Sequence, residues 1–136
     1  MRTKDQGFTL IEMMLVVIII GVLASLVMPR LVGRTEQAKI AAVKADIEAN
    51  IPLALDLFSS DIGRYPTAEE GLMALRANPG SLDKWGGAYL KRDPKDPWGN
   101  PYNYRSPGSH NTDYDLYSSG PNGIDDGGSG DDVGNW

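Results

Sequence analysis

Gly7-Phe8-Thr9-Leu10-Ile11-Glu12 opens an apolar run that continues to Met28 and decides the first element of the fold. As an α-helix, residues 8–28 would be about 31 Å long at 1.5 Å per residue. That length matches a hydrocarbon core of about 30 Å, so the run predicts a transmembrane helix. Desolvating a lone carboxylate costs about 2.5–3.5 kcal/mol at a bilayer centre. Glu12 therefore needs a partner, and that partner bears on the function.

The residues before the run predict its orientation. Arg2 and Lys4 form a basic flank that Asp5 only partly offsets, which favours a cytoplasmic N-terminus and export of the rest of the chain. A cleaved secretory signal would need small residues at a cleavage site, and Ala24-Ser25-Leu26 is a poor candidate because a large residue follows. A plain signal anchor fits the hydropathy but leaves Glu12 unexplained.

Length and composition restrict the remaining possibilities. The chain has 136 residues, enough for one modest domain and a long N-terminal element. Its net charge of −5 argues against general nucleic-acid binding, and without cysteine it has neither disulfides, zinc–thiolate sites nor thiol catalysis. No nucleophile–base spacing, phosphate loop or zinc motif occurs, and the lone histidine, His110, is expected to be a solvated loop residue. We therefore do not expect an enzyme.

After Pro29 the sequence becomes amphipathic. Apolar residues recur at spacings of three or four and form one stripe: Ile40, Val43, Ile47, Ile51, Leu55 and Phe58. The pattern predicts one long helix over residues 8–59, with a transmembrane half at 8–29 and an amphipathic stem at 30–60. Pro29 predicts a kink. Pro52 removes the hydrogen bond to the Glu48 carbonyl, which predicts a bend near residues 48–52 that carries no function.

Residues 61–136 are expected to form a globular head. Thr67 and Glu70 make a capping box that predicts a short helix ending near Ala77, with Leu72 and Leu75 facing inward. Aromatic residues and alternation predict three short strands, at residues 89–91, 102–104 and 114–117. A small antiparallel sheet laid against the stem helix gives an α+β fold.

The segment 119–133 is acidic and rich in glycine. Glycines let backbone carbonyls converge and carboxylates supply hard oxygen ligands, a combination that Ca²⁺ prefers. The side chains with suitable oxygens are Asn122, Asp125, Asp126, Asp131 and Asp132. The EF-hand pattern fails because no glutamate closes a 12-residue loop. Residues 127–132 fit the start of a single calcium-binding nonapeptide repeat, a weak signal. The alternative is a solvated acidic loop.

The N-terminal stretch resembles the processing site of type IV pilins and type II secretion pseudopilins, because Gly7, Phe8 and Glu12 follow a short basic leader. The resemblance implies that a membrane peptidase cuts between Gly7 and Phe8, removes the leader 1–7 and N-methylates Phe8. In a filament, Glu12 would then meet the Phe8 ammonium of a neighbouring subunit. Such a pair sets register more than stability. Alternatively, Glu12 only aids peptidase recognition or sits near headgroups.

The same resemblance assigns roles to two further residues of the apolar helix. Gly21 and Pro29 bound the stretch that, in these families, loses helicity when the filament assembles. The alternative reading is a static proline kink.

Motifs scattered over the head are similar to those of the major pseudopilin of type II secretion, the protein G family: residues 63–67, 70–72, 96–102, 114–118 and 134–136. This implies a structural subunit that polymerises into a periplasmic pseudopilus. Its partners would be further copies, minor pseudopilins, an inner-membrane assembly platform and the prepilin peptidase. The chain would cross the Gram-negative inner membrane once, with a periplasmic head. The alternatives are a type IV pilin-like subunit for adhesion, motility or DNA uptake, and a membrane-tethered enzyme or calcium-dependent binding module.

The family resemblance also implies a calcium site in the acidic segment. Carried over by position, its ligands are Asp131, Asp132, the Ser119 carbonyl and the Asn122 side chain. The family typically has aspartate where Asn122 stands, and a neutral amide weakens affinity, so Asp125 or Asp126 is expected to compensate. Ca²⁺ would fold the tail onto the sheet and stiffen a head that has no disulfides.

Overall fold

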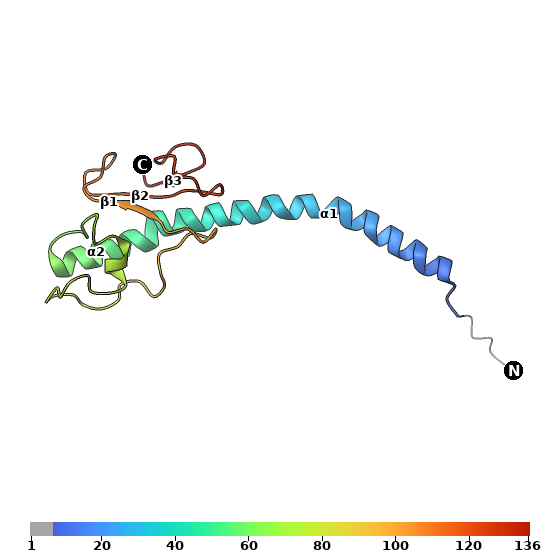
Figure 1. Ribbon diagram of the computed structural model, residues 1–136, viewed down its shortest axis with the longest axis horizontal. Helices are drawn as coiled ribbons and strands as arrows, with labels where there is room; N and C mark the ends of the chain where they lie inside the picture. Colours follow the sequence, from blue (N-terminus) through green and yellow to red (C-terminus); the bar gives the residue numbers. More distant parts are fainter. Residues whose placement is uncertain (1–6) are drawn as a thin grey trace. The chain divides into compact units, whose positions relative to one another are not determined.

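The helical part of the chain is nearly continuous in the computed structural model, which describes residues 7–136 and, for residues 28–32, the backbone alone. The α-helix α1 (Leu10–Ala45), a π-helix (Asp46–Asn50) and α2 (Ile51–Ile62) follow one another without a break (Figure 1). The sequence predicted a helix over 8–59. Most of the expected leader lies outside the described residues. The chain divides into two compact units, at residues 1–37 and 38–136.

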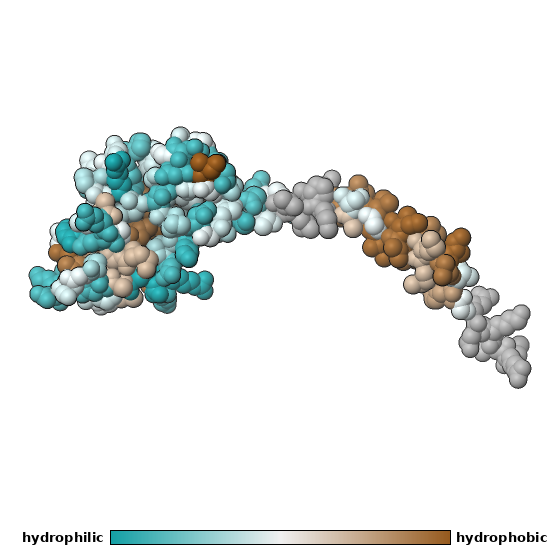
Figure 2. Space-filling view, viewed as in Figure 1, coloured by the Kyte–Doolittle hydropathy of each residue, from teal (hydrophilic) through white to brown (hydrophobic). Residues whose placement is uncertain are grey.

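The N-terminal unit carries an apolar helix whose described side chains have no cover. Leu10–Val27 is long and apolar enough to cross a membrane. Its large apolar side chains are about half exposed or more, as the continuous apolar surface in Figure 2 shows. The backbone stays helical through Gly21 and Pro29, so the subunit itself shows no loss of helicity between them.

The irregularity expected from Pro52 takes the form of a π-helix. The Ile51 N–H donates to the carbonyl of Asp46, five residues back, instead of the four of an α-helix. Pro52 is the second residue of α2 and has no N–H to donate, and the wider turn lies directly before it. A wide helical turn at 46–50 thus accompanies Pro52, and the bend near 48–52 stays a prediction.

The predicted apolar stripe of the stem forms one side of the core. Val43, Ile47, Ile51, Leu55 and Phe58 are all at least 97% buried. From the rest of the head the core receives Leu72, Ala74, Leu75, Tyr102 and Leu116. These positions follow from the helical period, because residues three or four apart share a face.

The head's sheet has three antiparallel strands in the order β1-β2-β3: β1 (Asn103–Arg105), β2 (Asp115–Ser118) and β3 (Val133–Gly134). Asn103 lies opposite Tyr117, and Ser118 lies opposite Val133. Two of the predicted strands are correct to within one residue. The one predicted at 89–91 is wrong, because the Tyr89 and Leu90 N–H groups both donate to the Leu75 carbonyl.

The predicted helix at 67–77 is also wrong, although its capping box forms. The Thr67 N–H donates to Glu70 Oε2 over 2.8 Å, and the Glu70 N–H donates to Thr67 Oγ1 over 3.2 Å. The segment then turns, because Gly71 has a φ of +59° that no α-helix contains. Only a 3₁₀-helix, Leu72–Leu75, follows, with both of its leucines buried as expected.

Candidate assembly and metal-binding sites

Glu12 has hydrogen-bond partners within its own chain. Its Oε2 accepts from the Thr9 N–H over 2.8 Å and from Thr9 Oγ1 over 2.9 Å, while the Glu12 N–H donates to Thr9 Oγ1 over 3.3 Å. These bonds form a capping box at the start of α1. Sequence reasoning missed it, although the Thr9-Leu10-Ile11-Glu12 pattern carries the signal.

Phe8 and Glu12 are both open to a neighbour. The Phe8 side chain is 84% exposed, and Glu12 is exposed as well. Gly7, Phe8, Thr9 and Glu12 line one open hollow at the beginning of the helix. The expected cleavage point and the carboxylate therefore lie together, and Glu12 has polar partners before any second subunit arrives.

Three of the predicted metal ligands come together in the acidic segment. Asp126, Asp131 and Asp132 each offer a carboxylate oxygen, and these oxygens lie within 4.8 Å of one another. Asp132 Oδ2 accepts from the N–H groups of Asp126 and Gly128 at 3.0 and 2.9 Å. Asp132 Oδ1 is buried without a hydrogen-bond partner. A buried carboxylate oxygen without a donor, among two other carboxylates, fits a hard cation.

The other predicted ligands have different partners. Asp125 Oδ1 accepts from the Tyr117 hydroxyl over 3.0 Å and from the Gly127 N–H over 2.9 Å, outside the cluster. Asn122 Oδ1 accepts from the Ile124 N–H over 2.6 Å, while its Nδ2 donates to Asp131. Asp126, rather than Asp125, therefore lies with Asp131 and Asp132 in the cluster.

The backbone that follows Ser119, at Gly120, lies close to the cluster. Its own hydroxyl accepts from Asn103 Nδ2 over 2.9 Å. The next residue, Gly120, has a φ of +63°, and a Cβ there would collide with the Asp131 carbonyl. Only glycine allows this close approach. The 119–120 backbone therefore lies directly against one of the three clustered aspartates.

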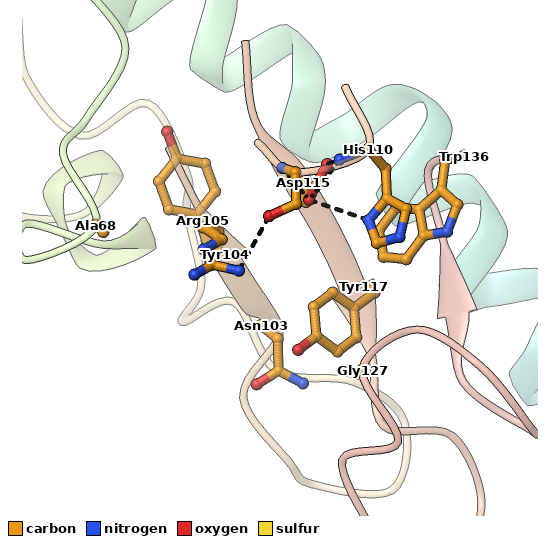
Figure 3. A pocket seen from close by; sticks show the side chains of 10 residues that line it. Ala68, Asn103, Tyr104, Arg105, His110, Asp115, Tyr117, Gly127 and Trp136 are labelled. Atoms are coloured by element: carbon orange, nitrogen blue, oxygen red, sulfur yellow. Dashed lines mark hydrogen bonds and ion pairs between the residues drawn. The ribbon is translucent and has the colours of Figure 1, made fainter. Parts of the chain in front are cut away.

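A second polar region surrounds a cavity of about 400 Å³, which is lined by residues of β1 and β2, by the 109–110 turn and by Gly127 of the acidic segment (Figure 3). Asp115, which is buried, accepts the N–H groups of Ser109, His110 and Asn111. Burial alone would raise the pKa of Asp115, but these hydrogen bonds to the ionised form lower that pKa to about 2. The carboxylate therefore organises the 109–111 turn.

His110 is more constrained than the sequence suggested. Its ring stacks on Trp136 with centroids 4.1 Å apart and planes 1° from parallel. Its Nδ1 lies 3.2 Å from Asp115 Oδ2. Although the side chain is 47% exposed, it is held on both sides and packs against the C-terminal residue. This long-range contact has no local signal in the sequence.

Comparison with known families covers most of the chain. Residues 30–136 match the family model "Type II secretion system (T2SS), protein G", and residues 2–28 match the "Prokaryotic N-terminal methylation motif". The type II secretion system core protein G of Pseudomonas aeruginosa is 46% identical over 140 residues, which cover 99% of this chain and 97% of that protein. The chain belongs to the protein G family of type II secretion. The Vibrio cholerae core protein G is also 46% identical, over 98% of this chain and 92% of that protein.

A solved structure confirms the fold class for this protein G family member. The major pseudopilin from the type 2 secretion system of enterohaemorrhagic Escherichia coli is similar with a TM-score of 0.65 and 36% identity. The similarity covers 78% of this chain and 89% of that one. The α+β prediction, a helix followed by a small antiparallel sheet, is confirmed.

Proposed function

We propose that this protein G family member is a structural subunit of the periplasmic pseudopilus, which helps type II secretion move folded proteins across the outer membrane. One observation carries the proposal. The uncovered apolar helix Leu10–Val27, with Glu12 in its first turn, lies within the match to the methylation motif at residues 2–28 and precedes a protein G head at residues 30–136. A helix that is apolar on every side must be covered by lipid or by other chains. The head match favours this role over a type IV pilin-like subunit.

The proposed sequence of events is leader cleavage, membrane anchoring and then assembly. Prepilin peptidase removes residues 1–7 on the cytoplasmic side and methylates Phe8. The helix then holds the subunit in the inner membrane in a single pass, with the head in the periplasm. Assembly joins it to further copies and to minor pseudopilins on the inner-membrane platform. The basic flank of the leader supports this orientation.

In the assembled filament, Glu12 pairs with the Phe8 ammonium of a neighbouring subunit. The carboxylate changes partners when this happens. In the single chain it accepts two hydrogen bonds from Thr9, which lessen the cost of holding a carboxylate in an apolar helix. A correctly placed neighbour then supplies a positive charge. A subunit in the wrong register leaves both charges unpaired in an apolar environment, which opposes its incorporation.

Genetic replacement tests the proposed role. Deleting the chain from its host should leave type II substrates in the periplasm, and the wild-type chain should restore their release. Gly7→Val should retain the leader, seen by mass spectrometry of the N-terminus, and should fail to restore release. Gly33→Ala serves as a matched control, because Gly33 lies outside the 21–29 stretch and a Cβ there has no neighbour within 4 Å in the single chain. Normal secretion after deletion, with loss of surface pili or DNA uptake, would support the pilin-like alternative instead.

The second part of the proposal is a Ca²⁺ site made by Asp126, Asp131 and Asp132. Asn122 and the Ser119 carbonyl complete the candidate ligand set. When bound, the cation supplies two positive charges that offset most of the repulsion among the three carboxylates. The buried Asp132 Oδ1 supports this assignment, since a cation would satisfy an oxygen that has no donor. The effect would be to fix residues 119–133 on the sheet.

Calcium titration of the full chain in detergent tests the site. The melting temperature should rise with Ca²⁺ and fall again with EGTA, because a ligand at 100 times its Kd stabilises the folded state by about 2.7 kcal/mol. Asp132→Asn should abolish most of the rise. Asp125→Asn is the control, since Asp125 lies outside the three-carboxylate cluster. A wild-type chain with no shift at millimolar Ca²⁺ would contradict the site.

A further inference from the structure

Asp96 is a buried carboxylate that the proposed sites do not use. Asp96 is only 4% exposed. Oδ1 accepts from the Trp98 N–H over 3.1 Å and from the Asn100 N–H over 2.8 Å, and so holds the turn that begins at Asp96. A buried carboxylate is expensive unless it is fully hydrogen-bonded. These two bonds satisfy one of the two carboxylate oxygens. The other oxygen, Oδ2, binds a different part of the head.

The second oxygen connects this turn to the end of β2. Asp96 Oδ2 accepts from the Ser118 hydroxyl over 2.7 Å, and Ser118 is completely buried. Because the hydroxyl proton is donated to Asp96, Ser118 Oγ is free to accept, and it takes the Gly120 N–H over 3.1 Å. A short bond to an ionised acceptor is among the stronger hydrogen bonds in proteins. Asp96 therefore determines which way the Ser118 hydroxyl points.

This hydrogen-bond chain ends at the cation loop. Gly120 is the residue whose backbone lies against the Asp131 carbonyl. A second contact joins the same two segments, since a Cβ on Gly123 would lie 3.2 Å from Asn100 Nδ2. Residues 96–100 thus support the acidic loop at its first turn, although none of them belongs to the cluster of Asp126, Asp131 and Asp132.

The other side of the turn is attached to the stem. The Lys39 ammonium lies 5.9 Å from the centre of the Trp98 ring, a cation–π distance. The Tyr102 hydroxyl donates to Asp46 Oδ2 over 2.9 Å, at the start of the π-helix. The turn is therefore a fixed platform, and the loop is joined to it through Ser118.

We propose that Asp96 is a positioning residue for the divalent-cation loop. Acting through the Ser118 hydroxyl, it holds the Gly120 N–H and places the 119–120 backbone against Asp131 before the cation arrives. This inference rests on the cation site proposed above. Preorganisation lowers the cost of ordering a loop on binding. Loss of outer-shell partners of this kind typically weakens metal affinity by about 10–100-fold.

Calorimetry of Ca²⁺ binding to the full chain in detergent tests the proposal. Asp96→Asn and Ser118→Ala should each weaken affinity by about tenfold or more. The double variant should be scarcely weaker than either single one, because both changes break the same chain of bonds. Ser118→Ala leaves the bonds from Asp96 to its own turn in place, so it remains informative if Asp96→Asn does not fold. Tyr104→Phe is the control, since it removes a part-buried hydrogen bond to the Pro66 carbonyl.

Hydrogen exchange in EGTA gives a readout that does not need the metal. The Gly120 amide and the loop 119–133 should exchange faster in Asp96→Asn and Ser118→Ala, and at the wild-type rate in Tyr104→Phe. Wild-type affinity in both Asp96→Asn and Ser118→Ala, or an equal loss of affinity in Tyr104→Phe, would overturn the positioning role of Asp96 but not the cation site. A wild-type chain that binds no Ca²⁺ would overturn the cation site itself and this inference with it.

Discussion

Two stretches of the same helical run, Leu10–Val27 and Val43–Phe58, differ in the exposure of their apolar side chains. In the first, apolar side chains cover every side and stay exposed: Leu23 is 57% exposed. In the second, they form one stripe that is buried: Phe58 is 0% exposed. Both stretches are helical, so secondary structure alone does not distinguish them.

The difference lies in where the missing contacts come from. Val43–Phe58 finds its partners in the head, so the stability of the head is a property of one chain. Leu10–Val27 finds none among the described residues of the chain, and its contacts must come from lipid or from other subunits. Substitutions in the two stretches should therefore change different measurements.

A pair of truncations makes the largest contrast. Phe58→Ala should destabilise the head by about 3–5 kcal/mol, because it removes a fully buried ring and leaves a cavity. Leu23→Ala should change head stability by less than about 0.5 kcal/mol, as exposed positions do. Thermal unfolding of both full chains in detergent, followed by near-ultraviolet circular dichroism, measures this. Equal losses in the two variants would show that the helix halves do not differ in this way.

Within the head, a comparison of two glycines separates the effect of backbone conformation on stability from the effect of close packing. Gly120 and Gly127 have nearly the same φ, +63° and +68°, but only Gly120 has a backbone neighbour where a Cβ would go. Gly120→Ala should cost about 1–3 kcal/mol more than Gly127→Ala, because overpacking adds to the conformational strain they share. Chemical denaturation of each variant gives the difference. Similar losses of stability in the two variants would argue that the close approach of Gly120 to Asp131 does not restrict the residue at position 120.

Sequence periodicity predicted the parts of the molecule that depend on local repetition. The membrane-length run, the buried stripe and two strands follow from spacing alone. Gly71 ended the predicted helix after one turn because one positive φ outweighs the capping box before it. The segment at 89–91 failed for a different reason, since its N–H groups bind the distant Leu75 carbonyl.

The sites were predictable in composition but only partly in detail. Clustered aspartates and glycines indicated a cation loop, and three of the predicted residues do converge. Which extra carboxylate joins them depends on Tyr117, which holds Asp125 by its hydroxyl. The Asp96–Ser118 bond joins residues 22 positions apart, and no local pattern reports such a contact. Only the Thr9–Glu12 capping box was readable from sequence and overlooked.

A surface ion pair should give the smallest effect. Arg64 binds Glu70 through two bonds of 2.6 and 2.7 Å, and this partner lowers the pKa of Glu70 to about 2. The pair should therefore stabilise the folded head fully above pH 4.5 and lose that contribution as the pH falls toward 2. Because the Arg64 side chain is 42% exposed, Glu70→Gln should cost only about 0.5–1 kcal/mol.

Denaturation at several pH values measures that contribution. The difference between wild type and Glu70→Gln should be largest near neutral pH and shrink below pH 4.5. Glu69→Gln, at the exposed neighbouring position, is the matched control. A difference that grows toward low pH would have the wrong sign for this ion pair.

The most direct test of the account separates the charge of Glu12 from its capping bonds. Glu12→Gln keeps an oxygen that accepts from Thr9 but removes the charge, whereas Thr9→Ala keeps the charge and removes the hydroxyl. The measurement is the amount of subunit in sheared pseudopilus filaments, with N-terminal processing checked by mass spectrometry. The account predicts that both variants are processed, that Thr9→Ala assembles, and that Glu12→Gln does not. Wild-type filament yield from Glu12→Gln would contradict it.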